Sequence, residues 1–319
     1  MQAAIDISVL MCVYNGEAFI RSAVDSVLAQ TLRSFELIIV NDGSTDRTRE
    51  ILAAFRDERI QVVDVPHGGI AQALNTGLRL ARAPLVARFD ADDICYPHRL
   101  QKQLDFMKQH PECTIAGSAA DYIDQHGAHV FTFFPPACTD PEIQRIKKAM
   151  CPFIHSSVIF RTEAVRNAGG YHLHTHTFED HFLWLKILAC GKGYNMREPL
   201  LQVRLNPGSL TIDEKWRTRE FHRIRNRVLE NELITEEDGH TLDRIIRRQD
   251  NAKTKQGAYY SLLAKKYLWN NYQPIKAREN IRKVLRFHPA DWHSYLMWML
   301  SWFPEPAVKT IYRISRNIH

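Results

Sequence analysis

Short apolar segments alternate with amphipathic ones from residue 5 to residue 110. Four times, an apolar run leads through a polar break into a segment with hydrophobic residues at helical spacing. The apolar runs are 5–14, 35–40, 60–65 and 84–89, and the helical segments that follow them are 18–30, 47–55, 70–81 and 97–110. Strands that are apolar throughout and separated by helices are typical of a parallel sheet covered on both faces. The pattern therefore predicts an α/β fold.

The polar breaks of this pattern carry amide and acidic side chains. Asn15 follows the first apolar run, Asp42 the second, and Asp90 and Asp92 the fourth. In a parallel sheet, ligands bind where the carboxyl ends of the strands face a crevice. We therefore expect these four side chains to converge on one cleft, although up to 77 residues separate them.

Residues 89–100, FDADDICYPHRL, crowd Asp90, Asp92 and Asp93 into four positions. Carboxylates this close raise one another's pKa, but a hard divalent cation between them converts the repulsion into ligation. The alternative is a solvated acidic turn that caps the helix beginning near Pro97. The position of the cluster, at the end of an apolar strand, favours the cation.

The turn NDGSTD, residues 41–46, ends another apolar run in the same way. Ordinary turn chemistry followed by a helix cap explains this turn as well as ligand binding does. In the binding interpretation, the Asp42 carboxylate accepts a hydrogen bond from a ring N–H such as that of uracil. Tyr14 of VYNGE then offers a flat face to a base, unless VYNGE is only a strand-to-helix corner.

Beyond residue 212 the sequence reads as helix after helix, which predicts a first domain over 1–212 and a helical region over 213–319. Residues 257–289 indicate a helix pair around the break NNYQP, similar to a single tetratricopeptide-like unit. One such unit cannot bury its own apolar face. It must therefore pack on the first domain, on further helices or on another subunit.

The last segment, 291–316, combines aromatic and basic residues: Trp292, Trp298, Trp302, Phe303, Lys309, Arg313 and Arg316. Two interpretations compete. The segment forms an aromatic helical core, which we favour, or it lies on an anionic membrane as an amphipathic element.

Charge and composition narrow the classes of protein. The chain has 319 residues, 45% of them hydrophobic, which is enough for one large or two smaller cores. Residues 211–319 carry 21 Lys and Arg against 13 Asp and Glu, so the net charge of +6 belongs to this part. The N-terminus has no signal-peptide pattern, no span of about 20 apolar residues occurs, and the six cysteines form no CxxC pair. We expect a cytoplasmic protein.

Four segments in order resemble the family 2 inverting glycosyltransferases of the GT-A fold: 8–46, 68–103, 169–186 and 203–211. The resemblance implies a nucleotide-binding parallel or mixed sheet sandwiched by helices. It also implies a nucleotide-sugar donor, usually a UDP-sugar, and Mn²⁺ or Mg²⁺ held by Asp92 with Asp90. The residues that it places around the nucleotide are Tyr14, Asn15, Glu17, Asp42, Asn75, Arg88, Asp90 and Ala91.

The resemblance makes Asp180 of the ED pair the general base, with Glu179 as the alternative. An acceptor hydroxyl must lose its proton as it attacks the sugar C1, which calls for a carboxylate within hydrogen-bond reach. Such an in-line displacement inverts the anomeric centre. The structural alternative is that Asp180 only interacts with the N-terminal end of the helix dipole. Trp184 and Leu185 of the following helix are expected to face the core.

One position departs from the family pattern. Related chains often read Arg-x-His where this chain has Asn206, and that histidine joins the metal site. An amide oxygen also ligates Mg²⁺ or Mn²⁺, though less strongly than imidazole ligates Mn²⁺. We assign His172, His174 and His176 to the surface or the acceptor rather than to a second metal.

We therefore expect a glycosyltransferase that moves a sugar to a saccharide or lipid-linked acceptor in polysaccharide or cell-surface glycan synthesis. The alternatives are a sugar-nucleotide nucleotidyltransferase, for which the glycine-rich basic first loop is missing, and a non-catalytic helical scaffold with a relic cleft. The expected partners include no nucleic acid. They do include a peripheral contact with the inner face of the plasma membrane, through the basic aromatic C-terminus, and a second copy of the chain.

Overall fold

The computed structural model describes residues 5–209 and 212–316. The chain divides into two compact units. Unit 1 comprises 1–120, 133–203 and 222–243, and unit 2 comprises 121–132, 204–221 and 244–319. The division into 1–212 and 213–319 stays a prediction.

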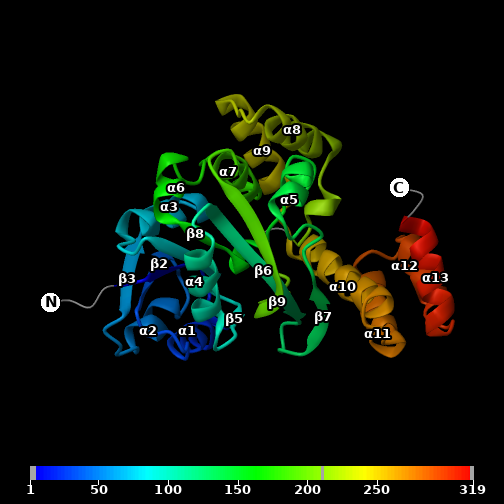
Figure 1. Cartoon of the computed structure of the whole chain (residues 1–319). Helices are drawn as coiled ribbons and strands as arrows, with labels where there is room; N and C mark the ends of the chain where they lie inside the picture. Colours follow the sequence, from blue (N-terminus) through cyan, green and yellow to red (C-terminus); the bar gives the residue numbers. More distant parts are fainter. Residues whose placement is uncertain (1–4, 210–211, 317–319) are drawn as a thin grey trace. The chain divides into compact units, whose positions relative to one another are not determined.

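The strands of the described residues form one nine-stranded mixed sheet in the order β3-β2-β1-β4-β8-β6-β9-β5, with β7 paired to β6 (Figure 1). Their bounds are β1 (Ile7–Val13), β2 (Phe35–Asp42), β3 (Ile60–Val65), β4 (Leu85–Asp90), β5 (Ile94–Cys95), β6 (Cys113–Ile123), β7 (His129–Phe133), β8 (Ile159–Arg161) and β9 (Lys192–Arg204).

The four predicted strands are β1 to β4, and they are parallel, as the apolar runs indicate. Their register places Cys12 beside Asp90, Val13 beside Asn41 and Asp42 beside Val65. The carboxyl ends of β1, β2 and β4 therefore lie at one edge of the sheet. Beyond β4 the sheet becomes antiparallel, because β8 pairs in the opposite direction with both β4 and β6.

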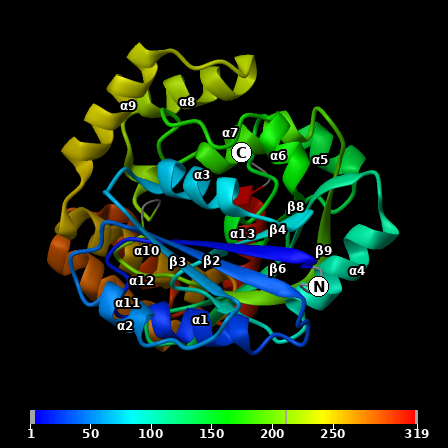
Figure 2. The ribbon, with the colours of Figure 1, turned by 90° about the vertical axis from the view of Figure 1, so that its left-hand side faces the viewer.

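The four predicted helices are also present, as α1 (Ile20–Leu28), α2 (Thr48–Ala53), α3 (Ile70–Leu80) and α4 (Arg99–Gln109). Figure 2 shows α3 on one face of the parallel strands and α1 and α2 on the other. Each helix that packs on the sheet buries a single apolar stripe, such as Ala73, Leu74 and Leu78 of α3. Sheet and helices together form the doubly covered layer that the sequence predicts.

The remaining helices before residue 250 are α5 (Asp140–Ile146), the short η1 (His155–Ser157), α6 (Thr162–Asn167), α7 (Glu179–Ile187), η2 (Glu214–Trp216), α8 (Arg219–Asn231) and α9 (Glu236–Gln249). Helix α7 is largely buried, with seven of its nine residues shielded from solvent. Trp184 is 0% and Leu185 1% exposed, which confirms that both face the core. The first turn of α7, with Glu179 and Asp180, is thereby held firmly by hydrophobic packing.

Unit 2 ends in four helices, α10 (Ala252–Trp269), α11 (Pro274–Phe287), α12 (Trp292–Leu300) and α13 (Glu305–Arg316). The predicted helix pair is α10 with α11, and Pro274 begins the second helix as an N-terminal proline. Its apolar face packs on further helices, since Tyr267 and Ile281 share a core with Met297 of α12 and Val308 of α13. None of the described helices combines the length and hydrophobicity needed to cross a bilayer.

Candidate active site

The loops that follow β1 and β2 hold each other by hydrogen bonds between side chains and backbone. The Asn15 backbone N–H donates to Ser44 Oγ at 2.9 Å, and the Thr45 N–H donates to Asn15 Oδ1 at 2.8 Å. Asn15 adopts a left-handed backbone with φ of 51°, which asparagine tolerates better than most residues. The Arg47 N–H donates to Glu17 Oε2 at 3.1 Å. The structure thus places Asn15 and Glu17 at the sheet edge with their side chains bracing the neighbouring loop.

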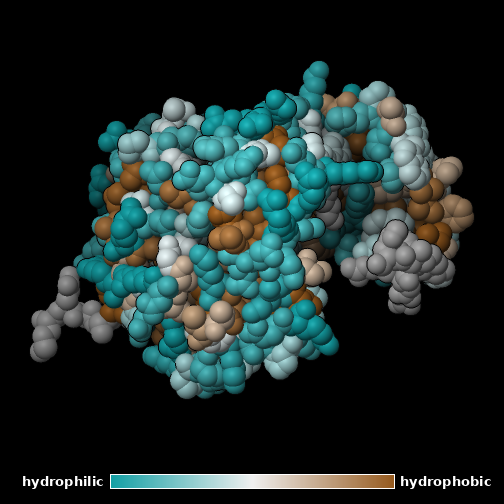
Figure 3. Space-filling view, turned by 90° about the horizontal axis from the view of Figure 1, so that it is seen from above, coloured by the Kyte–Doolittle hydropathy of each residue, from teal (hydrophilic) through white to brown (hydrophobic). Residues whose placement is uncertain are grey.

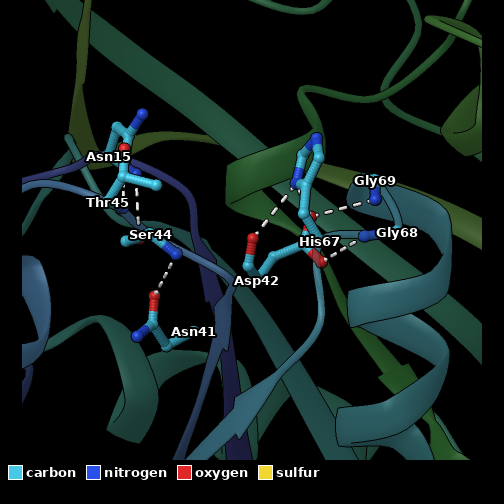
Figure 4. Close-up of polar contacts among 8 residues, drawn as sticks. All are labelled: Asn15, Asn41, Asp42, Ser44, Thr45, His67, Gly68 and Gly69. Atoms are coloured by element: carbon cyan, nitrogen blue, oxygen red, sulfur yellow. Dashed lines mark hydrogen bonds and ion pairs between the residues drawn. The ribbon is translucent and has the colours of Figure 1, made fainter.

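Asp42 ends β2 and is 3% exposed. Its carboxylate accepts two backbone hydrogen bonds, from the N–H of Gly68 at 2.8 Å and of Gly69 at 3.0 Å (Figure 4). His67 Nδ1 lies 3.0 Å from Asp42 Oδ2. Gly43 makes this approach feasible, because it has φ of 68° and a Cβ there would lie 2.7 Å from the His67 backbone N. The orientation of the Asp42 carboxylate is therefore fixed by the loop after β3.

His67 also stacks on Tyr14, with ring centroids 4.1 Å apart and an interplanar angle of 25°. Tyr14 remains 48% exposed. Sequence reasoning missed His67, although the polar break after the third apolar run, residues 66–69, was the signal that could have identified it. The flat surface expected of Tyr14 alone is thus a pair of rings.

Asp90 ends β4, and its carboxylate pairs with the guanidinium of Arg88. Arg88 is 2% exposed, while the Asp90 side chain is 34% exposed. Ala91 and Asp92 are half-buried, and Asp93 is buried. The helix-cap interpretation of this cluster is wrong, because α4 begins at Arg99, its N-cap residue is His98, and its first turn holds no acidic residue. The chain therefore turns at the sheet edge with the Asp90 carboxylate partly accessible.

Glu179, which is buried, and Asp180, which is half-buried, form an acidic pair at the start of α7. Asp180 Oδ1 accepts a hydrogen bond from the His181 N–H at 2.6 Å, and the Cys151 thiol lies 3.8 Å from Oδ2. Glu179 is 6% exposed, and no described residue donates a hydrogen bond to its Oε2. One oxygen of Glu179 thus lacks a donor among the described residues, whereas each oxygen of Asp180 has a contact.

Burial is the main cause of the raised pKa of both groups. Burial and then the charge of Asp180 raise the pKa of Glu179 to about 8. Burial also raises the pKa of Asp180, but the His181 amide and the Arg88 charge oppose that rise. The two carboxyl groups are adjacent, so a charge on one disfavours a charge on the other. Asp180 is half-buried and Glu179 buried, so Asp180, which is nearer to water, ionises first. At neutral pH the proton accordingly stays on Glu179 and the negative charge on Asp180.

Asn75 lies on α3 and is bonded to the loop that leads into α7. Its Nδ2 donates to the Tyr171 carbonyl at 2.7 Å, and its Oδ1 accepts from the Tyr171 N–H at 2.9 Å. Gly170 allows this approach, since it has φ of 72° and a Cβ would lie 2.5 Å from Asn75 Oδ1. Asn75 thus orders the chain ahead of Glu179, and its predicted contact with a nucleotide stays a prediction.

A comparison with protein-family models matches residues 8–168 to "Glycosyl transferase family 2". The chain belongs to glycosyl transferase family 2. It is a glycosyltransferase, and this membership favours that activity over the nucleotidyltransferase and scaffold alternatives.

The segments that match this family 2 glycosyltransferase make up most of the length of the relatives named here. The chain is 33% identical to the amylovoran biosynthesis glycosyltransferase AmsE of Erwinia amylovora over 215 residues, 66% of this chain and 80% of the relative. It is 33% identical to the putative glycosyltransferase EpsE of Bacillus subtilis over 211 residues, 64% of this chain and 74% of the relative. Against the O-antigen biosynthesis glycosyltransferase WbnJ of Escherichia coli, the identity is 29% over 206 residues, 63% and 80% of the two chains.

Solved structures support the fold of this family 2 member. S. aureus TarS 1-349 superposes with a TM-score of 0.56 at 18% identity, covering 98% of this chain and 92% of that one. The mannosyltransferase PcManGT of Pyrobaculum calidifontis gives a TM-score of 0.54 at 14% identity, covering 98% and 88%. At these identities the likeness establishes the GT-A-type architecture alone.

The family implies a divalent cation, and the donor set of the chain fits one. In the residues that the structure describes, no group of three or more His, Cys, Asp or Glu side chains could hold a metal by itself. Mg²⁺ and Mn²⁺ bind through one or two carboxylates when substrate phosphates supply further oxygens. Asp90 and Asp92 at the sheet edge provide such a set. Asn206 lies in unit 2, and its share in metal binding stays a prediction.

Proposed function

We propose that this chain transfers a sugar, with inversion, from a UDP-sugar to a saccharide or lipid-linked acceptor in polysaccharide synthesis. One relative is named an amylovoran biosynthesis glycosyltransferase, another an O-antigen biosynthesis glycosyltransferase, and a third a putative glycosyltransferase. TarS has been crystallised with UDP and with UDP-GlcNAc, and PcManGT with GDP-Man and Mn²⁺. The observation that carries the proposal is the edge of the sheet, where Asp42 and Asp90 end the two strands that flank β1 in a family 2 fold.

The donor nucleotide is proposed to bind along this edge. The Asp42 carboxylate accepts a hydrogen bond from an N–H of the base, through a lone pair that the Gly68 and Gly69 amides do not use. The base stacks on the Tyr14 ring. Asp90 contacts the ribose, and its ion pair with Arg88 keeps its carboxylate in place. Asn15 and Glu17 act by holding the two loops that shape the base site.

Asp92 with Asp90 would hold Mn²⁺ or Mg²⁺ against the diphosphate. The cation supplies positive charge to the leaving group, on which negative charge develops as the sugar C1–O bond breaks. Carboxylate oxygens are the ligands that both ions prefer.

Asp180 is the proposed general base. The acceptor hydroxyl oxygen forms a bond to the sugar C1 while the bond from C1 to the diphosphate oxygen breaks, and the hydroxyl proton passes to the Asp180 carboxylate. Glu179 is the less suitable base, because burial and its charged neighbour keep it protonated at neutral pH. The Cys151 thiol and the His181 amide hold the Asp180 carboxylate in position.

The test is the release of nucleotide from a panel of nucleotide-sugars, measured with Mn²⁺ or Mg²⁺ and with EDTA. UDP-sugars should be turned over with metal, and the Asp92→Ala variant should lose that turnover. The matched control is Asp105→Asn, an exposed carboxylate on α4, which should keep it. Turnover that is undiminished in EDTA would contradict the role of Asp92. A thermal shift with GDP or dTDP, but none with UDP, would overturn the donor assignment while sparing the fold.

A further inference from the structure

Helix α12 presents its large hydrophobic side chains outward. Four of them recur at the spacing i, i+3, i+4 and i+7, which is one face of a helix. Two more, directly after the helix, continue that spacing. The exposed fractions are 63% for Trp292, 51% for Tyr295, 41% for Leu296, 59% for Met299, 68% for Trp302 and 50% for Phe303. We call these six residues the α12 patch.

The opposite side of α12 faces the protein with small polar residues. Ser294 is 0% and Ser301 1% exposed, with Met297 between them at 5%. The serine hydroxyls satisfy themselves locally, since Ser294 Oγ donates to Asp291 Oδ2 at 2.7 Å and Ser301 Oγ to the Trp298 carbonyl at 2.6 Å. A helix of a water-soluble domain normally turns its apolar stripe inward. Helix α12 departs from this rule because it is apolar on both sides: Met297, Trp298 and Leu300 pack in or against the core of unit 2. The core-favouring interpretation is wrong for Trp292, Trp302 and Phe303, which are exposed.

Six large hydrophobic side chains that are exposed on one surface mark a site of interaction. In the space-filling view, hydrophobic side chains are visible on the right-hand side, on unit 2 (Figure 3). The aromatic residues of the patch are of the kind that concentrates at membrane–water interfaces, where a ring has an apolar body and a polar edge. Lys309 is exposed on α13, whereas the side chains of Arg313 and Arg316 lie outside the described ones.

Two arginines of the neighbouring helix α11 lie against aromatic rings of the α12 segment. Helices α10 and α11, residues 252–287, carry nine Lys and Arg against a single acidic residue, Glu279. Helix α11 packs on α12, and the Arg278 guanidinium lies 4.2 Å from the centre of the Trp302 ring. Arg282 lies 5.0 Å from the centre of the Trp298 ring. Arginine is therefore stacked directly against the aromatic residues of this surface.

We propose that the α12 patch docks on an anionic lipid bilayer, with its aromatic side chains in the headgroup region and the cations of α11 on lipid phosphates. An apolar face buried in the interface, together with basic residues that meet anionic lipid, is the combination that binds peripheral proteins to membranes. This surface would keep the glycosyltransferase beside the bilayer without a spanning helix.

A second copy of the chain is the competing occupant, and the charge disfavours it. Symmetric self-association would bring the same surface of both copies together. Arg278 and Arg282, which lie against the aromatic residues of α12, would then be brought close to their own equivalents. Like charges in an interface oppose association, whereas anionic lipid removes the conflict.

The test is sedimentation of the full-length protein with vesicles of phosphatidylcholine, with and without phosphatidylglycerol. The protein should bind the anionic vesicles, less so as salt is raised, and bind neutral ones weakly. The double variant Trp292→Ser with Trp302→Ser should lose affinity about tenfold or more, since two large side chains no longer leave water. Arg282→Gln should reduce binding to anionic vesicles about fivefold and leave binding to neutral ones unchanged.

The matched control is Phe134→Ser, which removes an aromatic side chain that is 59% exposed but lies in unit 1. It should bind vesicles like the wild type, and all variants should keep the thermal melting point of the wild type because the changed side chains are exposed. Failure of the wild type to bind anionic vesicles would overturn the proposal. So would equal binding by the double tryptophan variant, or a dimer in analytical ultracentrifugation that the same variant dissolves while no vesicle binding is seen.

Discussion

The carboxylates at the sheet edge and those at the start of α7 have opposite surroundings. Asp42 accepts two backbone N–H groups and lies against His67, and Asp90 pairs with Arg88. Glu179 is buried and the adjacent Asp180 is half-buried, and Glu179 Oε2 has no donor among the described residues. The first set is held by fixed donors before any ligand is present, whereas burial raises the pKa of both carboxyl groups of the second set.

This difference separates two kinds of work. Carboxylates with fixed donors present a constant charge and geometry, which suits recognition of a nucleotide or a cation. A carboxyl pair whose pKa is raised by burial has a raised affinity for protons, which suits proton transfer. Replacing one carboxylate at a time tests whether the two sets of carboxylates have these different roles.

The largest effect is expected for Asp180→Asn. The amide cannot take the acceptor proton, so the transfer rate should fall about 10²–10⁴-fold while the donor KM stays nearly constant. Steady-state kinetics with saturating acceptor measures both values. The same variant should lower the pKa of Glu179, because the Asp180 charge is the second cause of its rise. A fall in rate of less than about tenfold would remove Asp180 as the base.

For Asp92→Asn, we expect turnover to fall about 100-fold, because the cation at the leaving group contributes several kcal/mol to the transition state. Excess Mn²⁺ should restore part of the activity if the amide oxygen still ligates the ion. Titration of turnover with Mn²⁺ would show the weaker binding as a shifted midpoint. An unchanged midpoint would mean that the metal binds elsewhere.

Asp42→Asn should cost about 1–3 kcal/mol of unfolding free energy, because an NH₂ group then faces one of the two backbone amides and a buried donor loses its acceptor. Urea unfolding measures this cost. The exposed Asp25→Asn on α1 is the control and should change stability by less than about 0.5 kcal/mol. Equal stability of Asp42→Asn and the wild type would show that the Gly68 and Gly69 contacts contribute little.

The smallest effect is expected for Glu179→Gln, as a shift of a few degrees in Tm. The pKa of Glu179 is about 8 in the folded chain against 4.5 in the unfolded one. Between these values the folded chain binds more protons, so its stability falls as pH rises. The glutamine variant should lessen that fall and melt higher than the wild type at about pH 8. A fall in Tm as steep as that of the wild type would place the titrating group elsewhere.

Sequence reasoning was most successful where a local pattern decides the structure. The strands β1 to β4 and the helices after them follow from hydrophobic periodicity, and the positions of Asp42 and Asp90 follow from the rule that parallel strands end at one edge. The contacts of His67 with Tyr14 and Asp42 could not be foreseen, because they depend on the path of a loop that no periodicity describes. The same holds for Asn15 and Glu17, whose side chains turn to the adjacent loop rather than outward.

The α12 patch shows a second limit. Periodicity finds that Trp292, Tyr295, Leu296 and Met299 share a face, but a helix can be rotated either way about its axis. The direction is set by which face the neighbouring helices accommodate, and here they accommodate Ser294 and Ser301. Composition alone therefore favoured a core for this segment, although Trp292, Trp302 and Phe303 are exposed.

The interlocked loops after β1 and β2 also bear on the thermodynamics of donor capture. Their backbone amides already meet Ser44, Thr48 and Asp46 side chains, so little chain freedom is left to lose. Calorimetry should report a modest entropic penalty for nucleotide binding to such pre-ordered loops, and association should not wait for these loops to close.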